Sequence, residues 1–281
     1  MKKSDRLFIS RKKTYIITVI VFCCVFTLYG SDKAYSLDIT AGLASWCAWG
    51  EQTMSGANYN PDMQSDPALL FGPTLSVKFA ENWNITFVYL YGKFNYEDKD
   101  SPGSYVPTIY QSKFKSKRSD IDLAINYRLN DYFKIFAGIK VMSFVMLPFE
   151  FMEDYGGGGG GGMANNVNPS DTRCDGLGAG LNATFPVAEN LFLLGTLSGF
   201  IGNAKVDVNT GSQIMQKGFS YKGINSNLSI AYYIASASTT ISLGARYQYF
   251  KIESNDWDAW SIKVNYSIYG MTLGATYSFS I

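Results

Sequence analysis

Six charged side chains share one phase of three alternating segments, and they are the residues best placed to do chemistry. They are Asp120, Asp122, Arg128, Lys134, Lys140 and Arg246. A period of two places successive side chains on opposite faces of a strand, so these charges share a face. The charged face could form an ion pathway or a binding constellation. Because both signs are present, we favour mutual neutralisation in a narrow interior, where an unpaired charge would be unfavourable.

Histidine is absent from the chain. It is the side chain most often used as a general base, so the usual hydrolase mechanisms lack that group. A hydrolase that works with carboxylates alone is the alternative. We expect no enzyme activity, no catalytic residues, no cofactor and no metal ligands. A formal net charge of +1 gives no support for nucleic-acid binding.

The charged positions belong to a hairpin that recurs along the chain. Residues 119–141 form two alternating runs joined at Asn130-Asp131, which predicts a tight turn. The same form recurs at 71–96, 176–201 and 222–250, with one single strand at 37–49 and another at 269–281. This count predicts ten antiparallel strands, with eight or twelve as alternatives. Pairing the first strand with the last would close an up-and-down β-barrel.

The connections between the expected strands differ in length with strand parity. The hairpin turns have about two to five residues, whereas most other connections are longer: 50–67, 97–112, 147–174, 207–217 and 253–258. Short turns at one end and long loops at the other are typical of outer-membrane barrels. A soluble sandwich has no reason to sort its loops in this way. Residues 37–281 are therefore expected to form one transmembrane β-barrel with five surface loops.

The first 36 residues predict a signal peptide. Six basic residues precede an apolar run at 15–28, and Ala34-Tyr35-Ser36 supplies the small residues of a cleavage site. The apolar run has 14 residues, which is short for a spanning helix of about 20. An uncleaved anchor is the alternative.

Aromatic residues gather near both expected rims of the barrel. We expect an outer belt and an inner belt that anchor the barrel at the two membrane interfaces. The outer belt comprises Trp46, Trp49, Tyr89, Tyr91 and Tyr96, and the inner belt comprises Trp83, Tyr127, Tyr132 and Phe133.

Cys47 and Cys174 lie at the loop ends of expected strands, and their spacing fits no zinc motif. The alternation points Cys47 outward and Cys174 inward. A disulfide is allowed in an exported protein. It would have to cross the mouth of the barrel through loop residues, so a disulfide and two free thiols both stay open.

The apolar phase slips at Tyr269-Gly270 in the last segment. Residues 258–281 are too long for one strand of about ten residues. The slip indicates either a bulge, which keeps one long strand, or a turn. We favour the bulge.

The signal segment, the repeated hairpins and the final YSFSI resemble small bacterial outer-membrane β-barrels such as the OmpA-like and OmpW-like proteins. The resemblance implies outer-membrane lipid as the surroundings and recognition of the C-terminal strand by the insertion machinery. This class of barrels also includes enzymes such as omptin proteases, whose mechanisms use a histidine that this chain lacks. We expect a structural or surface-interaction role, with a host or envelope ligand at the loops. A narrow passive channel for ions or small solutes is the alternative.

Overall fold

The computed structural model describes residues 37–55, 62–98, 108–111, 113–147, 149–155, 164–167, 170–209, 214–254 and 263–281. The expected signal peptide at 1–36 lies outside this part of the chain. The described residues are almost entirely strands, with one short 3-10 turn, η1, at Ala235–Ala237. They include no helix of the length and apolar character that a membrane crossing requires.

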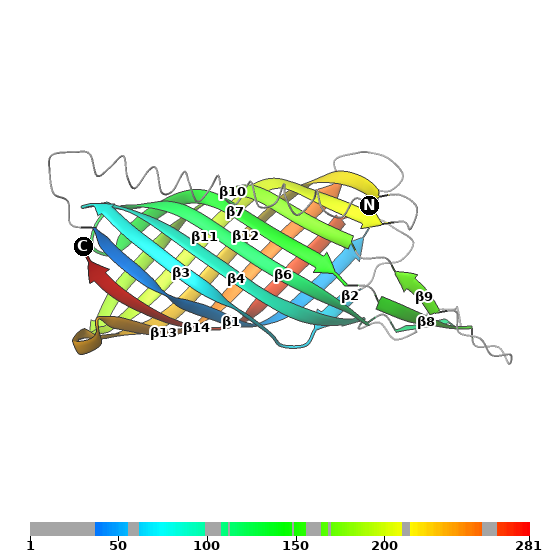
Figure 1. The fold of residues 1–281 in the computed structure, drawn as a ribbon, viewed down its shortest axis with the longest axis horizontal. Helices are drawn as coiled ribbons and strands as arrows, with labels where there is room; N and C mark the ends of the chain where they lie inside the picture. Colours follow the sequence, from blue (N-terminus) through cyan, green and yellow to red (C-terminus); the bar gives the residue numbers. More distant parts are fainter. Residues whose placement is uncertain are drawn as a thin grey trace.

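Ten long strands form a closed antiparallel ring (Figure 1). In ring order they are β1 (Asp38–Ser55), β3 (Ala68–Ala80), β4 (Trp83–Asp98), β6 (Lys113–Arg128), β7 (Phe133–Met146), β10 (Ser170–Ala188), β11 (Leu191–Asn209), β12 (Ile214–Ile234), β13 (Thr239–Ser254) and β14 (Lys263–Ser280). The ring closes because β1 pairs with β14 along its whole length, from Asp38 opposite Ser280 to Ser55 opposite Lys263. The protein is therefore an up-and-down β-barrel without a free sheet edge.

The sheet contains eleven strands instead of the expected ten, because the second strand of the ring is interrupted. β2 (Asp62–Ser65) pairs with β1 and β4, the same two neighbours that β3 has. Asp66 and Pro67 separate the two pieces. Proline has no backbone N–H to donate to a ladder, so the strand breaks there and the ring keeps ten positions.

Short turns join β3 to β4, β6 to β7, β10 to β11 and β12 to β13, and they define the turn side of the barrel. In the β6–β7 turn, the side-chain oxygen of Asn130 accepts hydrogen bonds from the backbone N–H groups of Tyr132 and Phe133, both at 2.9 Å. This local bond is the reason that asparagine favours turns. The long connections lie at the other end, the loop side.

Much of what the sequence indicates as loop is strand. β4 continues to Asp98 and β11 to Asn209, and β12 already begins at Ile214. A second sheet, composed of β5 (Thr108–Gln111), β8 (Phe149–Tyr155) and β9 (Ala164–Val167), comes from two of the expected loops. Figure 1 shows β8 and β9 beyond the loop end of the barrel, with the C-terminus at the turn end. Polar loop composition does not prevent strand pairing when neighbouring strands continue in register.

The slip at Tyr269-Gly270 is neither a bulge nor a turn. β14 runs through it, and its register with β1 continues without a shift from Met271 opposite Cys47 to Tyr269 opposite Trp49. What changes is the face that carries apolar residues. Tyr269 and Met271 point outward, whereas Ile268 is fully buried inside the ring. The slip therefore marks the level at which the barrel's apolar surface passes from its outside to its inside.

Candidate binding site in the barrel interior

The interior has two zones of different chemistry, and the loop-side zone is apolar. We call it the loop-side core, and its large members are Trp46, Leu70, Leu90, Phe94, Tyr96, Phe114, Met142, Phe144, Phe200, Phe219, Tyr221, Phe250, Ile252 and Ile268. All of them are buried. Rings from opposite parts of the wall meet across the lumen, since Phe144 of β7 lies 5.5 Å from Phe250 of β13 and 5.3 Å from Tyr266 of β14. This zone has no room for a wide aqueous channel.

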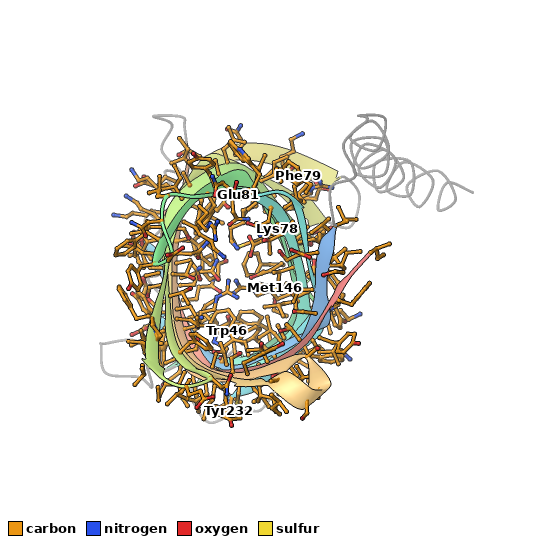
Figure 2. The ribbon with its side chains drawn as sticks, turned by 90° about the vertical axis from the view of Figure 1, so that its left-hand side faces the viewer. Trp46, Lys78, Phe79, Glu81, Met146 and Tyr232 are labelled. Carbon is orange, nitrogen blue, oxygen red and sulfur yellow. The ribbon has the colours of Figure 1, made fainter. Side chains whose placement is uncertain are left out.

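Trp46 and Tyr96 correct the expected outer belt. Their side chains are buried within the ring and not at the lipid interface. Figure 2 shows Trp46 and Met146 inside the ring and Tyr232 outside it. The alternation of β1 places Trp46 in the same phase as Ala48 and Gly50, which are also buried. Aromatic character alone could not separate an interface anchor from a core residue.

The remaining aromatic residues of the two belts point away from the lumen. On the loop side, Trp49 stacks on Tyr269 at 6.3 Å, and Tyr89 and Tyr91 are half-buried on the outer face of β4. On the turn side, Trp83 contacts Tyr127 at 4.7 Å, and Tyr132 stacks on Phe185 at 5.9 Å. Exposed Leu, Ile and Met side chains cover the outer wall between these levels. Such a band is the surface that a membrane barrel presents to acyl chains.

A buried ion pair lies within the loop-side core. Arg118 donates from Nε and Nη2 to the two carboxylate oxygens of Asp120, at 2.8 and 2.7 Å. Arg118 Nη2 also donates to Gln248 Oε1 at 2.7 Å. The aromatic rings of Trp46, Phe144 and Phe250 lie 5.2–5.9 Å from the guanidinium carbon. The expected charge set included Asp120 but missed its partner, although Arg118 precedes Asp120 by two residues in the same phase.

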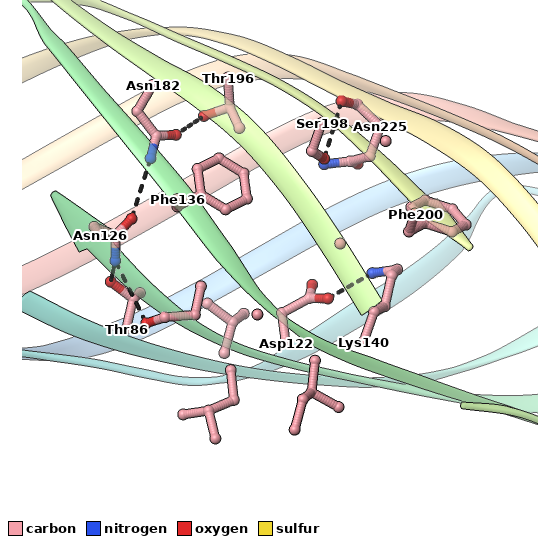
Figure 3. Close-up of a pocket in the computed structure, with 17 residues that line it drawn as sticks. Thr86, Asp122, Asn126, Phe136, Lys140, Asn182, Thr196, Ser198, Phe200 and Asn225 are labelled. Carbon is pink, nitrogen blue, oxygen red and sulfur yellow. Dashed lines mark hydrogen bonds and ion pairs between the residues drawn. The ribbon is translucent and has the colours of Figure 1, made fainter. Parts of the chain in front are cut away.

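The turn-side zone is polar and contains a partly open cavity of about 270 Å³. Its lining combines hydroxyl, amide and charged groups with two phenylalanine rings and several small residues. The residues that line it are Thr86, Val88, Asp122, Leu123, Ala124, Asn126, Phe136, Gly138, Ile139, Lys140, Gly178, Asn182, Thr196, Ser198, Gly199, Phe200 and Asn225. Strands β4, β6, β7, β10, β11 and β12 supply them. Figure 3 shows this arrangement.

Four of the lining side chains form one hydrogen-bonded chain across four strands (Figure 3). Asn126 Nδ2 donates to Thr86 Oγ1 at 3.0 Å. Asn182 Nδ2 donates to Asn126 Oδ1 at 3.3 Å, and Thr196 Oγ1 donates to Asn182 Oδ1 at 2.8 Å. Alternation predicts that these residues point inward, but only the register shows that they meet. The sequence does not predict this amide and hydroxyl chain, because its four residues meet only through the register of four different strands.

The expected charge set is divided into separate groups. Lys140 donates to Asp122 at 2.7 Å on the cavity wall, and its ammonium lies 5.6 Å from the centre of the Phe200 ring. Arg246 donates to Asn225 Oδ1 at 2.8 Å and lies 4.5 Å from the centre of the Trp46 ring. The pair of Lys140 and Asp122 agrees with mutual neutralisation, whereas the hydrogen-bond partner of Arg246 is a neutral amide.

Two members of the charge set lie at the turn-side rim, away from the others. Arg128 donates to Asn82 Oδ1 at 3.2 Å and lies 3.9 Å from both Glu81 and Asp131. Lys134 is paired with Arg128 in the ladder between β6 and β7. The structure therefore does not bring the six charges together as one constellation.

Cys47 and Cys174 are free. Cys174 is buried inside the ring, whereas Cys47 is half-buried on the outer face of β1. The disulfide alternative is therefore wrong, because the two thiols lie on opposite faces of the barrel wall. Among the described residues, no three His, Cys, Asp or Glu side chains gather into a group that could hold a metal ion.

Comparisons with known proteins show the fold. No family model matches the chain, and no curated protein matches it. The outer membrane protease OmpT from Escherichia coli superposes with a TM-score of 0.56 at 12% identity, over 89% of this chain and 100% of that chain. OprG from Pseudomonas aeruginosa gives a TM-score of 0.36 at 13% identity, over 88% of this chain and 97% of that chain. Ail of Yersinia pestis gives 0.29 at 11% identity, over 86% and 99%.

The chain has the fold of bacterial outer-membrane β-barrels. A closed barrel with an apolar outer band is built to lie in a membrane, because each strand of the ring pairs with a neighbour on both sides. The solved barrel that it resembles is an outer-membrane protein, and short turns in such barrels typically face the periplasm. The comparisons do not assign the chain to the OmpA-like or OmpW-like proteins.

Proposed function

We propose that this protein is a closed outer-membrane barrel whose loop side serves surface interactions. The observation that carries the proposal is the loop-side core. It fills the lumen and continues beyond the membrane level, so the strands support a packed platform instead of a pore. The ligand of that platform would be a molecule outside the cell or in the envelope.

Strand length supports this view. A transmembrane β-strand needs about 9–11 residues, whereas β11 has 19 residues and β12 has 21. The excess lies on the loop side, where apolar side chains point inward and polar ones outward. That arrangement is the core of a water-facing barrel, and it would hold the attached loops and the second sheet in a fixed orientation.

The second candidate, a narrow passive channel, is supported by the polar cavity on the turn side. A channel also needs a continuous water-filled path to the loop side. The buried pair of Arg118 and Asp120, with Gln248 and the surrounding rings, lies across that path. We therefore favour the closed barrel.

We also propose that the protein is not an enzyme of the histidine-dependent kind. One structural neighbour, OmpT, is named as a protease. The present chain has no histidine to act as its general base. The similarity of the two barrels supports a shared fold. It supports no shared catalysis through a histidine base, because this chain has no histidine.

Planar-bilayer recording tests the closed state. The refolded wild-type barrel should show no conductance above that of the lipid alone. Steady channel openings in the wild type, at several protein concentrations, would overturn the closed-barrel proposal and favour the channel.

Loop replacement tests the surface role. The segment 147–169 would be replaced by a short Gly-Ser turn, and vesicles with either barrel would be tested against arrays of glycans and matrix proteins. Wild-type vesicles should bind at least one class that the variant has lost. A substitution at Asn130 in the β6–β7 turn is the control, because this turn lies at the opposite end. Identical array patterns for the loop variant and the wild type would count against the proposal.

A further inference from the structure

We infer that the turn-side cavity is a binding site for one small, neutral, polyhydroxylated molecule of about the size of a monosaccharide. The inference goes beyond the surface role, because it concerns the opposite end of the barrel and a different ligand. It rests on the size of the cavity, on the hydrogen-bonding groups that line it, on its charge balance and on its closed loop-side end.

The cavity is large enough for a small molecule and too small for a polymer. Its volume of about 270 Å³ equals the space of roughly nine water molecules at about 30 Å³ each. The small residues Ala124 and Gly178 create part of this room, since larger side chains at these inward positions would extend into the cavity. A sugar ring fits this volume, whereas a chain of sugars does not.

The lining offers both donors and acceptors in fixed positions. The chain from Thr86 through Asn126 and Asn182 to Thr196 holds each amide in one orientation. Asn225 is held by Arg246 through its Oδ1, and its Nδ2 has no hydrogen-bond partner among the described residues. A ligand with several hydroxyl groups can donate to some of these atoms and accept from others. Preorganised polar groups of this kind give orientation and specificity in a small-molecule site.

Charge and aromatic content favour a neutral ligand with apolar ring faces. The two charges on the wall, Asp122 and Lys140, satisfy each other at 2.7 Å. A charged ligand would have to break that pair. A neutral ligand can instead hydrogen-bond to the carboxylate lone pairs and ammonium protons that point away from the bond between the two residues. Phe136 and Phe200 also line the cavity and offer flat apolar surfaces beside the polar groups. Sugars present C–H faces and hydroxyl edges, which match such a mixed wall.

The cavity has one route of access. On the loop side, Phe200 and the ion pair of Arg118 with Asp120 lie between it and the outer surface, and Arg118 and Asp120 are 0% and 1% exposed. A ligand would therefore enter from the turn side, which faces the periplasm. The source of the ligand would be the periplasmic pool of small solutes and not the medium.

Gly178 provides a direct test, because it faces the cavity. A Cβ at Gly178 would meet only Gly199 O at 3.3 Å and Phe200 Cβ at 3.5 Å. Gly178→Val would therefore fill part of the cavity with a small adjustment of the wall. Gly195 is the matched control, because it does not line the cavity and a Cβ there would meet only Ala183 Cβ at 3.9 Å. A side chain at Gly195 would lie on the outer face of β11, in the phase of the exposed Leu197.

The experiment measures binding of glucose, N-acetylglucosamine and sorbitol to the refolded full-length barrel in detergent, by saturation-transfer NMR and titration. At least one of them should bind saturably to the wild type and to Gly195→Val. Binding should be at least tenfold weaker in Gly178→Val and in Asn182→Ala, which removes one link of the hydrogen-bonded chain. Asn182→Ala keeps the test valid if Gly178→Val does not fold.

Three results would overturn the inference. The first is no saturable binding of any of the three probes, which would leave the cavity a water-filled space. The second is equal binding by the wild type and both cavity variants, which would place the bound sugar elsewhere. The third is stronger binding of glycine, as a zwitterionic probe, than of any sugar, which would make the ligand charged. None of these results bears on the closed loop-side core.

Discussion

Removal of the Asp120 carboxylate should destabilise the barrel far more than removal of any exposed carboxylate. Asp120 and Arg118 are 1% and 0% exposed, so no solvent can replace the lost partner. Asp120→Asn keeps the shape of the side chain and removes its charge. Arg118 then stays in the core with only neutral amide acceptors, at position 120 and at Gln248, and with three aromatic rings around it.

The size of the effect follows from the two bonds that are weakened. Arg118 donates to both carboxylate oxygens at 2.8 and 2.7 Å. A hydrogen bond to a charged group contributes about 1.5–3 kcal/mol. Breaking a buried ion pair on one side is destabilising by about 3–5 kcal/mol, because the other charge is left uncompensated. We therefore expect the free energy of unfolding to fall by about 3–5 kcal/mol in Asp120→Asn.

The paired replacement separates lost charge from lost packing. Arg118→Met with Asp120→Leu removes both charges and keeps apolar volume in the core. Replacing a buried ion pair in this way is often neutral or stabilising. The double variant should therefore recover most of the stability that Asp120→Asn loses.

The assay is urea unfolding of the refolded barrel in detergent, followed by tryptophan fluorescence and by the electrophoretic shift of the folded form. Asp175→Asn is the control, because Arg173 and Asp175 form a pair at 3.0 Å with about half of each side chain exposed. Exposed pairs contribute about 0–1 kcal/mol. The reasoning would be refuted by equal losses in Asp120→Asn and Asp175→Asn, or by a double variant less stable than Asp120→Asn.

Three further predictions concern the outer wall and the ladder. Burial, together with the neighbouring Asp207, raises the pKa of Asp171 above its ordinary value of 3.8 at the loop end of β10. The folded state then holds this proton more tightly than the unfolded state, and the associated stability is lost as pH rises through the raised pKa. The free energy of unfolding of Asp171→Asn should therefore exceed that of the wild type by a few tenths of a kcal/mol at pH 7 and be unchanged at about pH 3. The effect is small because solvent screens this partly exposed group. Urea midpoints at the two pH values measure it. Leu228 is 57% exposed in the middle of the apolar band, so Leu228→Arg should lower the free energy of unfolding in lipid vesicles by about 2–4 kcal/mol. Ser220→Arg, on the loop side of the same strand, should lower it by less than about 1 kcal/mol. Equal losses in the two variants would mean that the band does not contact lipid. A Cβ on Gly270 would overlap the carbonyl oxygen of Cys47, so Gly270→Ala should lower the refolded fraction on gels, and an unchanged yield would contradict the close approach of β1 and β14.

The sequence by itself predicted the ten long strands of the ring, their two faces and the closure of the sheet, but not the short strands β2, β5, β8 and β9. Alternation is a local property, since each residue sets the direction of its own side chain relative to the next. For that reason Asp122 and Lys140 could be assigned to one face, and the ends of the chain to one seam. Short turns with asparagine likewise report local backbone preferences, so the hairpins followed from the sequence.

Only the tertiary structure decided what each face meets at a given height along the barrel. At the loop end the apolar side chains turn inward, as Ile268 does, and between the aromatic belts they turn outward, as Met271 does. Trp46 lies inside although it is closer to the turn end than Trp49, because it packs around the buried Arg118. The alternation of one strand cannot show this change, because it distinguishes the two faces of the strand but not the part of the strand that lies in the membrane. The contacts of Arg118 with Gln248 and of Asn126 with Asn182 depend on the register of strands that are distant in sequence. Pairing of that kind is a property of the closed ring, and no single segment carries it.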